Sequence, residues 1–199
     1  MSVLKLLGIA VRNVQPVRFR VNAEECVCLT GPSGAGKSLL LRAIADLIPH
    51  QGDASLDGRL CSRMKPTLWR RQVGYLPAES HWWSDRVGDH FSHPHAESFR
   101  ELGFGTDVLD WRISRLSTGE RQRLALLRLL ANQPRALLLD EPTASLDAAG
   151  VSRVEAMLGT YQRENGAPLL WVSHDTEQIA RVAQRVCTLR EGRVEEVQA

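Results

Sequence analysis

Apolar residues gather along the chain in short runs that predict buried strands. Residues 26–29, 136–139 and 169–172 are uninterrupted apolar stretches, and residues 73–76 form a similar short run. Such runs are typical of strands that are covered on both faces of a parallel sheet. Residues 17–21 alternate apolar with charged side chains instead, which indicates a half-buried strand.

Helical periodicity follows several of these runs. Residues 37–47 and 118–132 carry apolar side chains at helical spacing, and a proline lies shortly after each segment. Residues 147–165 and 176–183 are further helix candidates. The repeated alternation of strand and helix predicts an α/β fold with a mostly parallel sheet flanked by helices.

Two segments depart from this alternation. Residues 52–58 end in an Asp-Gly turn and predict a small antiparallel hairpin beside the main sheet. Residues 78–115 are rich in His, Ser, Trp and Gly, and we interpret them as an inserted, mostly helical subdomain. We therefore expect a single domain over residues 1–199, with residues 1–77 and 116–199 forming its core.

Composition narrows the class of protein. A chain of 199 residues with 43% apolar content can bury a sizeable core, and its net charge of +2 lacks the large basic excess of a dedicated nucleic-acid binder. The four cysteines lack CxxC or scaffold-type spacing, which favours a reducing cytoplasm. No apolar run reaches the roughly 20 residues that a membrane-spanning helix needs. We expect any membrane-crossing part to be another chain.

A glycine-rich segment lies between the predicted strand at 26–29 and the predicted helix at 37–47. It matches the phosphate-binding pattern G-x-x-x-x-G-K-[ST] at every position. Its backbone N–H groups and the helix dipole favour phosphate, Lys37 is expected to bridge the β- and γ-phosphates of ATP, and Ser38 to hold Mg²⁺. The expected nucleotide-binding residues here are Gly31, Pro32, Ser33, Gly34, Ala35, Gly36, Lys37, Ser38 and Leu39.

Two adjacent carboxylates follow the apolar run at residues 136–139. Strands of a parallel sheet present their ligands at the carboxyl edge, where Asp140 and Glu141 are expected to lie. Asp140 is expected to orient Mg²⁺, and Glu141 to polarise the attacking water as a general base. A helix-capping role for these acids is the alternative.

Three further segments resemble those of the ABC ATPase family. Residues 116–123 resemble its signature sequence, residues 140–147 its extended Walker B motif and D-loop, and residues 171–175 its switch-histidine segment. Order and spacing agree over residues 19–192, and the chain is most similar to short bacterial cassettes that pair with a separate permease, including metal-export types. The resemblance implies a P-loop NTPase (RecA-like) fold with a small antiparallel β subdomain and an inserted helical subdomain.

The resemblance also implies an ATPase that works as a head-to-tail homodimer. Ser117, Thr118 and Gly119 of one chain would contact ATP held by the other, and His174 would contact the γ-phosphate and hold the attacking water in line with Glu141. Opening and closing of the dimer would drive a separate integral membrane permease, which implies a cytoplasmic chain, peripheral on the inner face of the membrane. No nucleic-acid partner is expected. The alternatives are a nucleotide-gated regulatory module and a non-transport ABC ATPase.

Three positions depart from the family pattern. Ala78 stands where the family carries its Q-loop glutamine, and Glu79 is a candidate substitute. No aromatic residue precedes Phe19 to stack on adenine, and Thr118 replaces the first glycine of the signature pair. From Ala78 we expect slower or differently coupled turnover, with ATP binding retained. The missing aromatic leaves the mode of base recognition open, and Thr118 is expected to be tolerated because Ser117 and Gly119 remain.

The predicted insert also contains two clusters with open roles. A histidine-rich loop is either a metal site or a solvated loop. Its members are His81, His90, His93 and His95. Trp82 and Trp83 lie where the family receives its permease, and both permease anchoring and core packing are consistent with them.

Overall fold

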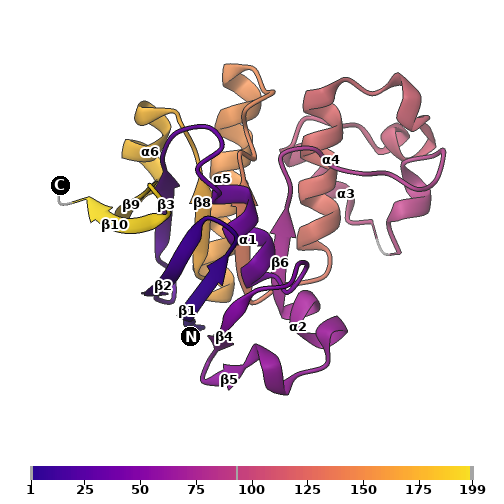
Figure 1. Cartoon of the computed structure of the whole chain (residues 1–199). Coiled ribbons are helices and arrows are strands. Elements are labelled where there is room, and N and C mark those ends of the chain that lie inside the picture. The colour runs from indigo at the N-terminus through magenta and orange to yellow at the C-terminus, as the bar shows by residue number, and fades with distance from the viewer. Residues whose placement is uncertain (1, 93, 198–199) are drawn as a thin grey trace.

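The computed structural model describes residues 2–92 and 94–197, and a six-stranded, mostly parallel sheet forms its centre (Figure 1). The strand order is β10-β9-β3-β8-β7-β6, and only β9 and β10 pair antiparallel. The strands are β3 (Cys26–Thr30), β6 (Val73–Leu76), β7 (Ala136–Asp140), β8 (Leu169–Val172), β9 (Arg185–Arg190) and β10 (Arg193–Val197).

A second sheet of four antiparallel strands has the order β2-β1-β4-β5. Its strands are β1 (Leu4–Val11), β2 (Val14–Val21), β4 (Gln51–Leu56) and β5 (Arg59–Leu60). Asp57 and Gly58 connect β4 to β5 with φ values of 51° and 78°. Positive φ at both central residues is the requirement of a type I′ hairpin turn, so the Asp-Gly signal is confirmed.

Each inner strand of the central sheet contributes side chains to two cores. Leu138 and Leu170 face a core that lies between the two sheets, whereas Leu137 and Trp171 face a core on the opposite side. Helix α1 (Lys37–Ile44) contributes to the first core. Because both faces of the strands are buried, the apolar runs are uninterrupted, as the parallel-sheet prediction requires.

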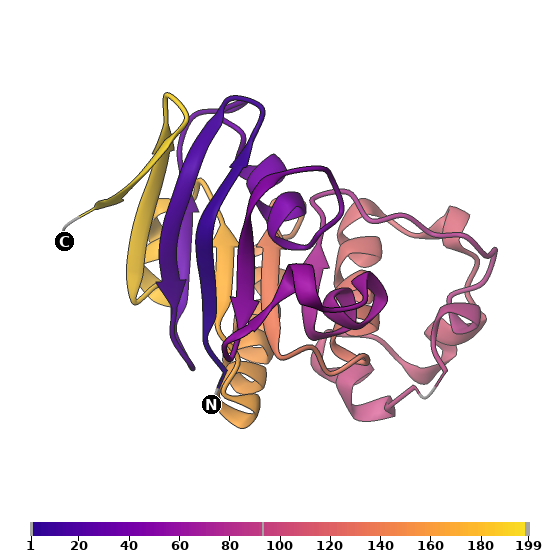
Figure 2. The ribbon, with the colours of Figure 1, turned by 60° about the horizontal axis from the view of Figure 1, so that its bottom comes forward.

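Helices cover the second face. α4 (Thr118–Leu130) and α5 (Ala148–Asn165) bury several side chains in that core, and partly buried residues of α6 (Thr176–Val182) pack against it. Figure 2 shows the two sheets side by side, with the segment between β6 and α4 at the opposite end of the molecule from β9 and β10. The α/β architecture is therefore the one expected.

The segment between β6 and α4 forms a lobe beside α4 (Figure 1). Over its described residues, the lobe has α3 (Ala96–Glu101) together with three 3-10 turns. Several of its apolar side chains, among them Phe99 and Leu102, are buried in the second core. The lobe is therefore packed against α4 and the central sheet through apolar contacts.

The elements that the pattern did not predict include α2 (Pro66–Gln72), β9 and β10. α2 is seven residues long and buries only Trp69, so it is too short to show a helical period. Its first residue is a proline, which suits the first position of a helix. No helix among the described residues is long and apolar enough to cross a membrane.

Candidate functional site

The carboxyl ends of three neighbouring strands bring the predicted site residues to one edge of the central sheet. β8 lies between β3 and β7, and all three strands are parallel. The glycine-rich loop follows β3, Asp140 ends β7, and His174 comes shortly after β8. This edge is where open α/β sheets bind ligands.

Glycines are required where the loop after β3 turns. Gly31 has a φ of 134°, and a Cβ atom there would lie 2.2 Å from the carbonyl oxygen of Leu189. Gly36 has a φ of 107°, and its Cβ would lie 2.7 Å from Val14 Cγ2. The loop is thus pressed against β9 and β2 in a conformation that L side chains rarely adopt.

The ammonium group of Lys37 lies within the curve of this loop. Lys37 Nζ donates hydrogen bonds to the carbonyl oxygens of Gly31, at 2.7 Å, and Pro32, at 3.0 Å. Burial lowers the pKa of Lys37, while the carboxylates of Glu141 and Asp140 act in the opposite direction. A positive charge is therefore held beside the two acids at the end of the strand β7.

Asp140 is buried and is held by a hydrogen-bonded pair from other elements. Tyr75 Oη donates to Asp140 Oδ2 at 3.1 Å, and Arg42 Nε donates to Tyr75 Oη at 3.4 Å. Burial is the largest cause that raises the pKa of Tyr75 to about 12, so the phenol remains a neutral donor at physiological pH. Tyr75 was not identified from sequence, because in an apolar run it looked like a packing residue.

Glu141 and His174 form a close pair at the same edge. Glu141 Oε1 lies 3.0 Å from His174 Nε2, and the two side chains are 34% and 45% exposed. The Glu141 backbone has a φ of 48° and its N–H donates to the Val172 carbonyl oxygen at 3.1 Å. A non-glycine residue held at positive φ is strained, and such strain concentrates at functional sites.

The signature residues lie elsewhere, at the N-terminus of α4. Ser117 caps this helix, since its Oγ accepts the Glu120 N–H at 3.2 Å and Glu120 Oε2 accepts the Ser117 N–H at 2.8 Å. Ser117 and Thr118 are exposed, and Gly119 lies against the backbone of Ser145. Within the described chain, the Ser117 side chain hydrogen-bonds only to Glu120 and its carbonyl oxygen accepts from the Arg121 N–H, so no hydrogen bond of Ser117 joins this segment to the loop after β3.

The segment at the Q-loop position is tethered to α4. Ala78 and Glu79 are both exposed. Gln122 is buried, its Nε2 donates to the Pro77 carbonyl oxygen at 2.9 Å, and its Oε1 accepts from Ser80 Oγ at 3.1 Å. Gln122 lies within the segment 116–123 that resembles the family signature, but its bonds to Pro77 and Ser80 were not predicted from the sequence.

Trp82, Trp83 and His90 of the insert form an aromatic cluster with Arg128. The His90 ring centroid lies 4.7 Å from that of Trp82 and 4.4 Å from that of Trp83, and the Arg128 guanidinium lies 4.4 Å from the Trp82 ring centroid. His90 is 8% exposed and Trp83 is 72% exposed. Packing therefore accounts for His90, whereas Trp83 presents its ring to solvent.

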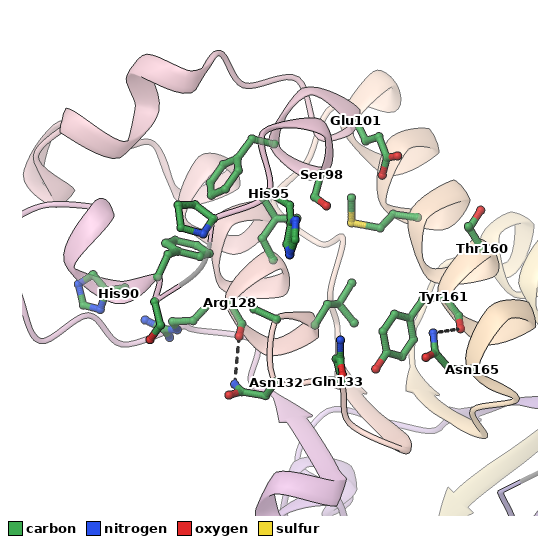
Figure 3. Close-up of a pocket in the computed structure, with 18 of the residues that line it drawn as sticks. His90, His95, Ser98, Glu101, Arg128, Asn132, Gln133, Thr160, Tyr161 and Asn165 are labelled. Atoms are coloured by element: carbon green, nitrogen blue, oxygen red, sulfur yellow. Dashed lines mark hydrogen bonds between the residues drawn. The ribbon is translucent and has the colours of Figure 1, made fainter.

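A pocket of about 1230 Å³ lies beside this cluster, with His90 and Arg128 at one end and Tyr161 of α5 at the other (Figure 3). His81 and His95 are exposed, and His93 lies outside the described residues. Over the part of the chain that the structure describes, no group of three or more His, Cys, Asp or Glu side chains could hold a metal ion.

Comparison with known proteins identifies the family. A family model described as "ABC transporter" matches residues 14–144. The chain is 35% identical over 187 residues to the probable iron export ATP-binding protein FetA of Escherichia coli (strain K12), covering 87% of this chain and 83% of that protein. The chain belongs to the ABC transporter family. This ABC subunit is also 34% identical over 203 residues to the molybdate/tungstate import ATP-binding protein WtpC of Archaeoglobus fulgidus, covering 90% of this chain and 79% of that protein.

A solved structure agrees with the ABC fold. An ATP-bound bacterial Atm1-family ABC exporter superimposes with a TM-score of 0.85 at 23% identity, covering 98% of this chain and 38% of that chain. The fold and family predictions are confirmed. The chain is an ATP-binding, ATP-hydrolysing subunit of an ABC transporter.

Proposed function

We propose that this ABC subunit hydrolyses ATP with Glu141 as the general base and His174 as its partner, and that the loop containing Lys37 binds the phosphates. The 3.0 Å contact between Glu141 and His174 is the observation that carries the proposal. A carboxylate accepts a proton from water, and an adjacent imidazole can hydrogen-bond the γ-phosphate. The exposure of both side chains keeps them accessible to nucleotide.

Mg²⁺ is proposed at Ser38 and Asp140. Mg²⁺ is usually bound by one or two protein oxygens together with substrate phosphates rather than by a closed protein cage. A buried carboxylate with a single phenol donor, next to the loop that precedes Ser38, fits this mode. When bound, the ion would neutralise charge on the phosphates, and Lys37 would contribute a second positive charge from the loop.

We propose that two copies close head to tail around ATP. The exposed Ser117 and Thr118 offer hydroxyl groups, and the N-terminus of the 13-residue helix α4 offers N–H groups and a positive dipole end. Ser117 donates its N–H and its hydroxyl proton to Glu120 Oε2. The nucleotide of a second subunit would therefore compete with this carboxylate for the Ser117 donors, while the exposed Thr118 hydroxyl is open to it. Gly119 beside Ser145 permits close approach of the backbone.

The proposed permease contact lies on the insert. Trp83 is 72% exposed and rests against Arg128 and His90, so a rigid aromatic ring is available to a partner.

We assign residues 78–115 to an inserted subdomain and residues 1–77 with 116–199 to the ATPase core. The subunit would then act in the cytoplasm, peripheral on the inner face of the membrane.

Three variants test the catalytic and dimer proposals together. Glu141→Gln should bind ATP and accumulate as a dimer, because binding is kept and the base is lost, whereas Lys37→Ala should not bind ATP. Ser117→Arg in the Glu141→Gln background should remain monomeric, since the large cation blocks the surface that meets the second nucleotide. Size-exclusion chromatography with light scattering, with and without ATP, provides the measurement.

The outcomes separate the alternatives. A trapped dimer in Ser117→Arg would contradict the proposed contact across subunits. Full hydrolysis by Glu141→Gln would remove Glu141 from the role of base. ATP binding and dimerisation without any Glu141-dependent hydrolysis, even with membranes present, would favour the regulatory alternative suggested by Ala78.

A further inference from the structure

A single buried amide joins the two segments that carry Glu141 and His174. Gln178 of α6 is 2% exposed and lies in none of the motifs that resemble the family. Its Oε1 accepts a hydrogen bond from Ser173 Oγ at 3.0 Å, and its Nε2 donates to Thr143 Oγ1 at 2.9 Å. Ser173 directly precedes His174, and Thr143 is two positions after Glu141.

The amide itself is held in one orientation by a third partner. Gln178 Nε2 also donates to Glu155 Oε1 at 3.0 Å, so both of its protons are used. Glu155 in turn accepts hydrogen bonds from Arg181, at 2.9 Å to Oε1 and 3.1 Å to Oε2. Helices α5 and α6 thereby fix which amide atom faces each of the two segments.

The start of α6 is tied to the same group. Asp175 caps this helix by accepting the N–H groups of Glu177 and Gln178 at 2.9 and 3.0 Å, and its own N–H donates to Ser173 Oγ at 3.1 Å. His174 therefore lies between two anchored neighbours. A displacement of Gln178 would move the His174 backbone relative to the segment that carries Glu141.

We propose that Gln178 is a positioning residue that sets the distance between Glu141 and His174. This inference rests on the catalytic roles proposed above for those two residues. A misplacement of about 1 Å at a reaction centre can lower turnover on the order of 100-fold. Because Gln178 contacts neither residue directly, its loss should lower kcat while leaving KM and ATP affinity close to the native values.

An exchange of side chains gives the sharpest test. Gln178→Glu sets a carboxylate against Glu155 and removes the amide donors, so kcat should fall at least tenfold. In the double variant Gln178→Glu with Glu155→Gln, the amide at position 155 donates to the carboxylate at position 178, so the hydrogen bond between the two positions is kept with its direction reversed. The double variant should restore kcat to within about threefold of the native value. Arg181→Ala removes only the exposed hydrogen bonds that Arg181 donates to Glu155, and it is the matched control. We expect its kcat to be unchanged.

Each variant is assayed for kcat, KM, affinity for a fluorescent ATP analogue and thermal midpoint. A kcat within twofold of native in Gln178→Glu overturns the proposal, as does a double variant that regains the thermal midpoint but not kcat. If Gln178→Glu does not fold, Ser173→Ala deletes one of the two links, and an unchanged kcat there overturns the proposal equally. Glu141→Gln measured in parallel distinguishes a failure of this inference from a failure of the proposed catalytic roles. Full activity in Glu141→Gln would reject Glu141 as the base, independently of Gln178.

Discussion

Gly31 and Gly34 of the phosphate loop differ in how much space a side chain would find at each position. Gly34 has a φ of 78° and nothing within 4 Å of an added Cβ, whereas a Cβ on Gly31 would overlap the Leu189 carbonyl. Gly34→Ala should therefore cost about 1–2 kcal/mol, the cost of a left-handed L residue. Gly31→Ala adds overlap with backbone and should cost about 3 kcal/mol or more. Urea unfolding without nucleotide measures both, and equal losses would contradict this account.

Residue roles were predictable from sequence only where spacing encodes them. Lys37 and Glu141 follow strands at fixed offsets, so a linear pattern located them. Tyr75 and Gln178 bond to partners 65 and 35 positions away in the chain, and the folded packing alone brings these groups together. The positions that hold the acids in place were therefore found only in the structure.

The start of α4 allows a prediction at the scale of the element. Ser117 and Glu120 form a reciprocal cap, and the backbone N–H of Ser117 is the main cause that lowers the pKa of Glu120 from 4.5. A carboxyl whose pKa is lower in the folded state than in the unfolded state stabilises the fold at pH values above its unfolded-state pKa. This stabilisation is lost as the pH falls through the folded-state pKa. The advantage of the native chain over Glu120→Gln should thus be full at pH 7 and smaller at pH 3. Urea unfolding at both pH values tests this, and a constant difference would contradict it.

Whether an element was predictable depended on how completely it is buried. β3, β7 and β8 are covered on both faces, so their apolar runs were evident, and the Asp57-Gly58 turn located the β4–β5 hairpin. β9 is only partly buried and β10 is an edge strand of mixed residues, so neither segment shows a continuous apolar run in the sequence. The insert relies on short turns that bury scattered apolar residues, which leaves no period to detect.

The whole molecule carries the last prediction, because the proposed site is complete only in a pair of chains. A ligand that binds the folded state stabilises it by about 2.7 kcal/mol at 100 times its Kd. If ATP also joins two copies, the stabilisation by ATP depends on protein concentration through mass action, whereas ATP bound to one chain gives a stabilisation without this dependence. For Glu141→Gln with ATP and Mg²⁺, the thermal midpoint should rise as protein concentration increases from about 1 to about 50 times the dimer Kd. Lys37→Ala with ATP, and Glu141→Gln without it, should show no such rise. An ATP-induced shift in Glu141→Gln that is the same at every protein concentration would mean that the nucleotide is held within a single chain, and the exposed hydroxyls of Ser117 and Thr118 would then have no part in binding it.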